Sequence, residues 1–144
     1  MKGTFSGVPD EPSYTIPIER TLEGTLGFQY ESADSEQARG RFQVEDTHKQ
    51  PFGIVHGGVY AAFAEGLCSS ATYLNVQGDG KIAVGSSNFT SFLRPVTHGV
   101  VIAEARALHR GRTTWVWECE FRNEDGKRCA VSRVTLAVID PPTR

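Results

Sequence analysis

Only one segment of this 144-residue chain can form a long helix, and that limits the folds open to it. Residues 59–76 are rich in alanine and free of proline, and they end just before a turn-forming stretch at 78–81. The segments with strand character, which are rich in β-branched residues or alternate apolar with polar residues, are 24–31, 38–45, 81–95, 100–109, 113–121 and 128–139. One helix among six strands predicts an α+β domain, in which an antiparallel sheet curls around a central helix.

Local patterns refine this outline. Phe42 and Val44 fall on one face of their strand and should be buried. Asp125 and Gly126 predict a two-residue hairpin between the last two strands. Prolines among polar residues predict a surface arm over the N-terminal segment. The expected organisation is an arm at 1–20, one domain at 21–140 and a tail at 141–144.

Composition and charge argue against several classes of protein. Fifteen basic and seventeen acidic residues give a formal net charge of -2, so we expect no nucleic-acid partner. Cys68, Cys119 and Cys129 form no CxxC pair and lack zinc-ligand spacing, which predicts reduced, apolar thiols and no metal. The N-terminal stretch lacks the apolar core of a signal peptide, and the helix, with Glu65 at its middle, is too polar to span a membrane. We expect a cytoplasmic protein with no membrane partner.

The predicted helix carries one ionisable carboxylate, Glu65, among apolar and small residues on all sides. Such a helix should be buried on most sides, and no cation lies three or four positions from Glu65 to pair with it. Glu65 is therefore either a structural partner of a distant arginine or a reactive group facing a slot, and we favour the second interpretation. Ser69, one turn further on, shares its face and could hold a water molecule, or could instead bond back to the helix.

The loop before the helix offers donors for a carbonyl group. Gly57 and Gly58 remove side-chain bulk where the first amide N–H groups of a helix are unpaired, as in an oxyanion site. His56 could act as a general base, but a structural hydrogen bond at the helix start is the favoured interpretation. The side-chain amide of Gln50 could polarise a carbonyl.

These residues carry a family resemblance. The stretches HKQPFGIVHGGVYAAFAE, AVGSSNFTSFLRPV and RGRTTWVWECEFRNEDGKRCAVS resemble the hotdog-fold acyl-CoA thioesterases that use a glutamate on the central helix. Within that branch they resemble the bacterial 4-hydroxybenzoyl-CoA thioesterases of aromatic compound degradation, which are related to thioesterases of phenylacetate pathways. The similarity runs from about Thr21 to Ile139. It implies a hotdog fold and hydrolysis of an acyl-CoA, with an aryl-CoA as the expected substrate.

The resemblance also implies roles for individual residues. Glu65 would be the nucleophile or general base, the Gly57 N–H would polarise the thioester carbonyl, and Gln50 would assist. Ser69 stands where the family has a water-positioning threonine. The expected CoA-binding and substrate-binding residues are His56, Gly58, Arg94, Arg112 and Thr113. Arg112 and Thr113 replace a Ser-Thr pair of the family, which adds positive charge.

The spacing of Gly57 and Glu65 has a geometric consequence. Eight helical residues separate them by about 12 Å along the axis, so one thioester carbonyl cannot contact both. If both serve one site they belong to different subunits, which predicts a homodimer, and the resemblance suggests a homotetramer. No metal or redox cofactor is expected, since CoA is part of the substrate. Two other functions stay open: a non-catalytic acyl-CoA binder, and a hotdog dehydratase using His56 with Glu65.

Overall fold

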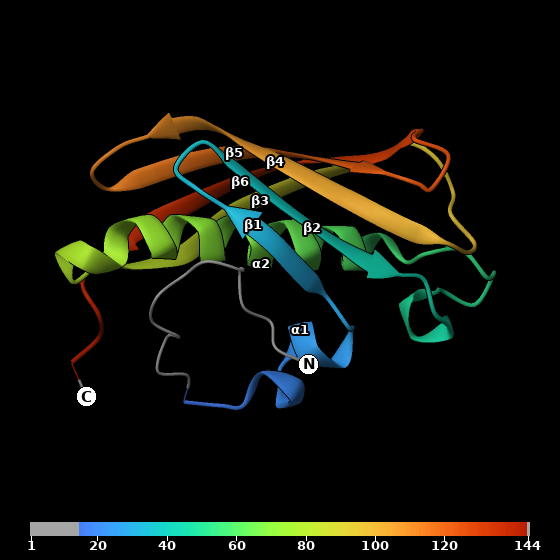
Figure 1. Ribbon diagram of the computed structural model, residues 1–144, viewed down its shortest axis with the longest axis horizontal. Coiled ribbons are helices and arrows are strands. Elements are labelled where there is room, and N and C mark those ends of the chain that lie inside the picture. Colours follow the sequence, from blue (N-terminus) through green and yellow to red (C-terminus); the bar gives the residue numbers. More distant parts are fainter. Residues whose placement is uncertain (1–14, 144) are drawn as a thin grey trace.

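The computed structural model describes residues 15–143, which form one antiparallel sheet with a long helix against one face (Figure 1). The elements in chain order are η1 (Ile18–Arg20), α1 (Leu22–Thr25), β1 (Gln29–Ala33), β2 (Gln37–Gln43), η2 (Asp46–His48), α2 (Gly57–Val76), η3 (Gln77–Asp79), β3 (Ile82–Phe92), β4 (Val100–Arg110), β5 (Thr114–Arg122) and β6 (Arg128–Ile139). The strand order across the sheet is β1-β2-β4-β5-β6-β3. This is the α+β architecture predicted from the single long helix.

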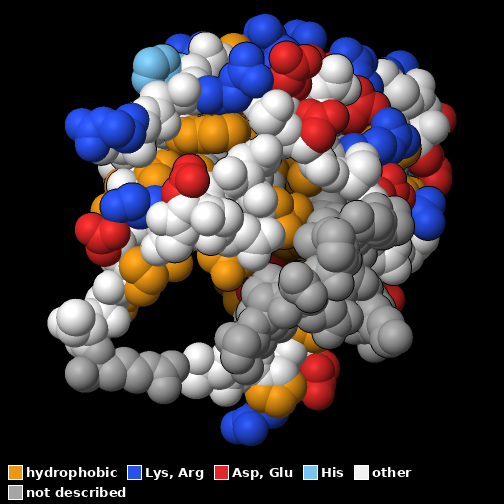
Figure 2. Space-filling model, turned by 60° about the vertical axis from the view of Figure 1, so that its left-hand side comes forward, with side chains coloured by type: hydrophobic (Ala, Val, Ile, Leu, Met, Phe, Trp, Pro, Cys, Tyr) orange, Lys and Arg blue, Asp and Glu red, His pale blue; other side chains and the backbone are white. Residues whose placement is uncertain are grey.

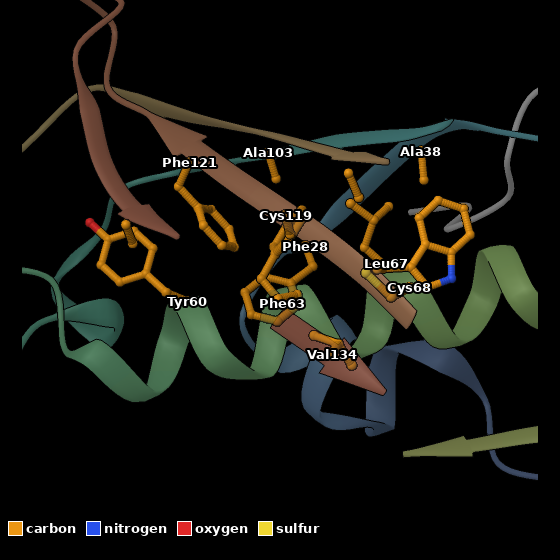
Figure 3. Close-up of a cluster of buried hydrophobic side chains, with 14 of the residues drawn as sticks. Phe28, Ala38, Tyr60, Phe63, Leu67, Cys68, Ala103, Cys119, Phe121 and Val134 are labelled. Carbon is orange, nitrogen blue, oxygen red and sulfur yellow. The ribbon is translucent and has the colours of Figure 1, made fainter. Parts of the chain in front are cut away.

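The core lies between α2 and the inner face of the sheet (Figure 3). Burial alternates along β5, where Trp117, Cys119 and Phe121 are fully buried beneath the helix. The helix contributes Phe63 and Leu67, which are also fully buried. Removing an aromatic side chain from such a core costs about 3 to 5 kcal/mol. The predicted burial of Phe42 and Val44 is confirmed.

The three cysteines are free and buried, as predicted. Burial raises the pKa of the Cys68 and Cys119 thiols, so both stay protonated and serve as small apolar groups. Close to Cys68, the Trp117 indole N–H donates to the Thr72 hydroxyl, 2.9 Å away, and that hydroxyl donates to the Cys68 carbonyl. This pair of bonds satisfies the buried polar atoms and ties α2 to β5.

Two local predictions were wrong. Residues 24–31 were expected as strand, but Leu22–Thr25 form α1 and the strand begins only at Gln29. Thr21 caps this turn: its hydroxyl accepts the Gly24 N–H and donates to the Ile18 carbonyl. A Cβ at Gly24 would lie 2.1 Å from that carbonyl oxygen, so the tight turn depends on glycine.

The β5–β6 hairpin is longer than the two residues predicted. Its loop spans 123–127, where the Asn123 side-chain oxygen accepts the N–H groups of Asp125 and Lys127. Gly126 adopts a φ of +77°, which favours a glycine at this position. It does so in a longer turn that the Asn123 side chain stabilises, and not in the predicted two-residue turn. The predicted arm falls mostly on residues 1–14, which lie outside the described residues.

Around Glu65, α2 is exposed. Among the described strands, β3 is an edge of the sheet and pairs with β6 alone. Glu65 is exposed, and its small neighbours Ala61, Ala62 and Ser69 are only half-buried. Of the residues of α2 only Gly58, Glu65 and Asn75 are exposed, so the helix is buried or half-buried on most sides, as predicted, and Glu65 lies on its exposed side. Within residues 15–143, no helix is long and apolar enough to cross a membrane.

Candidate active site

A cavity of about 560 Å³ lies at the first turn of α2 and has a mostly apolar wall. It is lined by Gln50, Ile54, Val55, His56, Gly57, Gly58, Tyr60, Phe92, Leu93, Arg94 and Pro95. The loop after η2, the start of α2 and the end of β3 supply these residues. Five residues singled out from the sequence thus meet here: Gln50, His56, Gly57, Gly58 and Arg94.

Hydrogen bonding at the helix start leaves one amide available. His56 is the N-cap: its Nδ1 accepts the Gly58 N–H at 2.8 Å, and its carbonyl accepts the Val59 N–H at 3.0 Å. Among the described residues, none accepts a hydrogen bond from the Gly57 N–H. The helix dipole also favours negative charge at this position. At the cavity wall, the Gly58 N–H is therefore used by His56, whereas the Gly57 N–H has no acceptor among the described residues, and the structural interpretation of His56 is confirmed.

Gln50 is oriented by its own loop. Its side-chain oxygen accepts the Phe52 N–H at 2.6 Å, which turns the side-chain nitrogen the other way. Its backbone N–H donates to the Ile54 carbonyl, and its carbonyl accepts the Gly53 N–H. These three bonds fix the residue in a tight turn, so the Gln50 amide offers N–H donors beside those of the helix start.

His48 anchors this loop and was missed by the sequence analysis. Its side chain is buried, with Nε2 2.6 Å from the Leu26 carbonyl and Nδ1 accepting the Glu45 N–H at 2.9 Å. Because Nδ1 accepts, the proton lies on Nε2 and is donated to Leu26. The His48 carbonyl accepts the His56 N–H at 2.8 Å. His48 thereby connects the start of the loop to its end. A single histidine in a sequence does not indicate such a role.

Phe92 forms the wall of the cavity opposite the helix start. A Cβ at Gly57 would lie 2.6 Å from the tip of the Phe92 ring, so the two residues are in close contact. Tyr60 also lines the cavity, whereas Phe63 and Trp115 are in the core and Phe89 is 76% exposed. Phe92 could have been found from the alternation along its strand, which aims it at the helix.

Glu65 and Ser69 lie outside this cavity, two and three turns further along α2. Among the described residues, none forms a hydrogen bond or an ion pair with the Glu65 carboxylate. The structural interpretation of Glu65 requires a distant arginine as its partner. Among the described residues, no arginine pairs with it. The Ser69 hydroxyl likewise makes no hydrogen bond with a described residue, so it is not bonded back to the helix.

Most arginines of residues 15–143 form ion pairs. Arg39, Arg41, Arg106, Arg110, Arg122, Arg128 and Arg133 each pair with a glutamate. These pairs make the outer face of the sheet a surface of interspersed basic and acidic side chains (Figure 2). Arg94 and Arg112 are exposed and form no ion pair within residues 15–143. Their charges are therefore free to meet an anionic ligand.

Arg94 and Arg112 lie at opposite ends of the sheet. The Arg94 N–H donates to the Cys129 carbonyl at the start of β6, whereas the Thr113 carbonyl accepts the Val138 N–H near its end. The span from Cys129 to Val138 corresponds to about 30 Å of strand. A single chain therefore does not bring together the two predicted groups of CoA-binding residues.

Comparisons with known proteins identify the family of this chain. A model described as Thioesterase superfamily matches residues 52–130, more than half of the chain. The proofreading thioesterase EntH of Cronobacter turicensis is 38% identical over 119 residues, covering 83% of this chain and 86% of the relative.

Solved structures are similar over most of their length. Thioesterase PA1618 of Pseudomonas aeruginosa, solved as a mutant, has a TM-score of 0.81 at 36% identity, covering 85% of this chain and 88% of that chain. Thioesterase HI1161 of Haemophilus influenzae has a TM-score of 0.80 at 36% identity, covering 85% of each chain. The chain therefore belongs to the thioesterase superfamily, has the hotdog fold and is a thioester hydrolase.

Proposed function

We propose that this protein hydrolyses an acyl-CoA thioester in a site shared by two subunits. Gly57 and Gln50 of one subunit polarise the thioester carbonyl, and Glu65 of the partner subunit attacks it or activates water. The observation that carries the proposal is the Gly57 N–H beside the apolar cavity, together with Glu65 about 12 Å along the same helix. Neither group has a hydrogen-bond or ion-pair partner among residues 15–143. Hydrolysis needs both groups within about 3 Å of the reacting atoms, which one chain does not allow.

One edge of β3 is unpaired among the described strands, and this edge supports such a dimer. Along this strand Phe92 contacts Gly57, and Asn88 donates to the Ala61 carbonyl at 2.8 Å, so α2 runs antiparallel to β3. Two β3 strands paired antiparallel about a two-fold axis near Asn88 and Phe89 would place Phe92 of one chain opposite position 85 of the other. The start of one α2 would then face Glu65 of the second.

The same axis brings the two arginine positions together. Arg94 lies at the end of β3, and the Arg112 turn lies at the other end of the sheet, next to the strand's beginning. An antiparallel β3 pair therefore places Arg94 of one subunit at the same end as Arg112 and Thr113 of the other. Arg94 also borders a second cavity of about 300 Å³ that includes Lys127. We assign these cations to the phosphates of CoA.

In the reaction, the carbonyl oxygen gains negative charge as the carbon becomes tetrahedral. The Gly57 N–H, at the positive end of α2, stabilises that charge by about 3 kcal/mol if it behaves like other oxyanion donors. Glu65 either attacks the carbon itself, so that the C–S bond breaks, CoA leaves as its thiolate and water opens the resulting anhydride, or it deprotonates a water molecule that attacks the carbon and expels the same thiolate. Ser69 lies one turn from Glu65 and holds the water in either case.

For the acyl group we propose an aryl thioester such as 4-hydroxybenzoyl-CoA. The cavity wall is apolar and includes the rings of Tyr60 and Phe92. The buried Tyr60 hydroxyl has no nitrogen or oxygen partner among the described residues and has only the Cys129 thiol beside it. Burial raises the pKa of this phenol, so it stays a neutral donor for a polar ring substituent.

Assembly of two dimers into a homotetramer is part of the proposal. Phe89 is 76% exposed on the outer face of β3, beside Arg133. Pairing of the β3 strands would set two Phe89 rings near the two-fold axis in the middle of the outer face. An apolar group at that place favours contact between the outer faces of two dimers.

A panel of CoA thioesters tests the proposed function. We expect thiol release from benzoyl, 4-hydroxybenzoyl, phenylacetyl and medium-chain acyl esters, with the highest kcat/KM for an aryl ester. A preference for the medium-chain esters would contradict the aryl assignment. Binding of every ester without thiol release would favour the non-catalytic binder, and elimination of water from a 3-hydroxyacyl ester with the thioester intact would favour the dehydratase.

A further inference from the structure

The Glu65 carboxylate lies against Gly85 of β3. A Cβ built on Gly85 would be 2.5 Å from the Glu65 Oε1 and 2.9 Å from its Cδ. The third-nearest atom, at 3.4 Å, is the Cγ of the same glutamate. A side chain at position 85 would therefore occupy the place of the carboxylate, and it would meet no other atom as closely.

The backbone at this position does not itself require glycine. Gly85 is absent from the glycines with positive φ, so an alanine there is not strained. It faces the helix, because it pairs with the buried Leu136 of β6. Further along the same face, Asn88 fills the corresponding gap with a hydrogen bond to α2. The missing side chain at position 85 thus leaves a space that the Glu65 carboxylate uses.

We infer that Gly85 is a positioning residue for Glu65. It lets the carboxylate lie flat on β3, at the free edge of the strand, where the Gly57 amide of the partner subunit would approach. A β-bulge between Gly85 and Ser87 changes the direction of the strand at this point, which brings its backbone beside α2. This inference rests on the proposed role of Glu65.

The test substitution is Gly85→Ala. The added methyl group displaces the flexible, exposed end of Glu65 and not the backbone, so the melting temperature should stay close to that of wild type. Displacing a reacting oxygen by about 1 Å costs up to about 100-fold in rate, so kcat should fall by about 10- to 100-fold. KM should change by less than about twofold, since the cavity and the arginines are untouched.

Gly78→Ala is the matched control. It also adds one methyl group to a glycine without a positive φ, but its Cβ would meet nothing within 4 Å. Its kcat should equal that of wild type. Size-exclusion chromatography with light scattering should show the same assembly for Gly85→Ala, Gly78→Ala and wild type.

Glu65→Asp provides the decisive comparison, because it withdraws the carboxylate from Gly85 by one methylene. Gly85→Ala should then lower kcat by less than about threefold in the Glu65→Asp background, although it lowers kcat 10- to 100-fold in wild type. If Gly85→Ala lowers kcat equally in both backgrounds, whether or not the dimer is lost, the substitution acts through the structure of β3 and not through the position of Glu65. That result would overturn the inference. Wild-type kcat for Gly85→Ala would also overturn it.

Glu65→Gln separates this inference from the proposed function. If Glu65→Gln keeps activity within tenfold of wild type, the catalytic role of Glu65 fails, and the inference fails with it. If Glu65→Gln is inactive while Gly85→Ala matches Gly78→Ala, only the positioning role of Gly85 fails.

Discussion

Mixing two inactive variants should restore activity if the active site is shared between subunits. The variants are Glu65→Gln, which removes the attacking or proton-accepting oxygen, and Gly57→Pro, which removes the proposed amide donor. Proline is tolerated in the first turn of a helix, where Gly57 stands. In a mixed dimer, one site carries both lesions, whereas the other combines an intact Gly57 with an intact Glu65.

The size of the expected recovery follows from the cost of each lesion and from the share of mixed dimers. Loss of the Gly57 donor costs about 3 kcal/mol, which is about 150-fold in kcat. Loss of Glu65 costs several orders of magnitude. Random exchange makes about half of the dimers mixed, each with one intact site, so about a quarter of wild-type activity should return. This recovery stands well above the residual activity of either variant alone.

The assay is thiol release after subunit exchange, with differently tagged chains to prove that mixed dimers form. Gly57→Ala is the matched control, because it adds the Cβ that presses on Phe92 but keeps the N–H. It should retain more activity than Gly57→Pro. Circular dichroism should show that each variant is folded. Proven exchange without recovery would mean that the donor and the glutamate act within one chain, or that Gly57 is not the donor.

Two further predictions concern charges. Arg94→Ala and Arg112→Ala should each raise KM for CoA esters about tenfold or more but leave KM for pantetheine esters nearly unchanged, because only CoA carries the nucleotide phosphates. Equal increases for both substrates would place these arginines away from CoA. Hydrogen bonds from Arg106 and Arg133 lower the pKa of Glu118 in the folded protein. The ionised Glu118 therefore stabilises the fold at a pH above the ordinary pKa of a glutamate. This stabilisation is lost as the pH falls through the lowered pKa of the folded state. Between about pH 5 and pH 3, the melting temperature of wild type should therefore fall more than that of Glu118→Gln; parallel curves would contradict this role.

The sequence was sufficient for features that depend on local pattern. Alanine content and the absence of proline located α2, and residues 128–139 were predicted with the bounds observed for β6. The two glycines that precede the apolar helix lie in the first turn of α2 and line the cavity, while their role as donors stays a prediction. These signals work because propensity and hydrophobic periodicity act over a few neighbouring residues.

Features that depend on distant neighbours were missed. The short helix at Leu22–Thr25 arises from a threonine cap and an unusually close carbonyl, which the strand-like composition hides. The loop anchor His48 and the cavity wall Phe92 are defined by contacts across the fold. The exposure of Glu65 follows from where the sheet ends, which no local pattern indicates.

The central claim is that Glu65 performs the hydrolysis, and the kcat of Glu65→Gln measures it most directly. The substitution keeps the size of an exposed side chain that makes no ion pair within residues 15–143, so the fold, the assembly and binding of the CoA ester should be unchanged. The account predicts that kcat for thiol release from the best ester of the panel falls by several orders of magnitude, with little change in the Kd of a nonhydrolysable CoA thioether. A folded Glu65→Gln protein with kcat within tenfold of wild type would contradict the account.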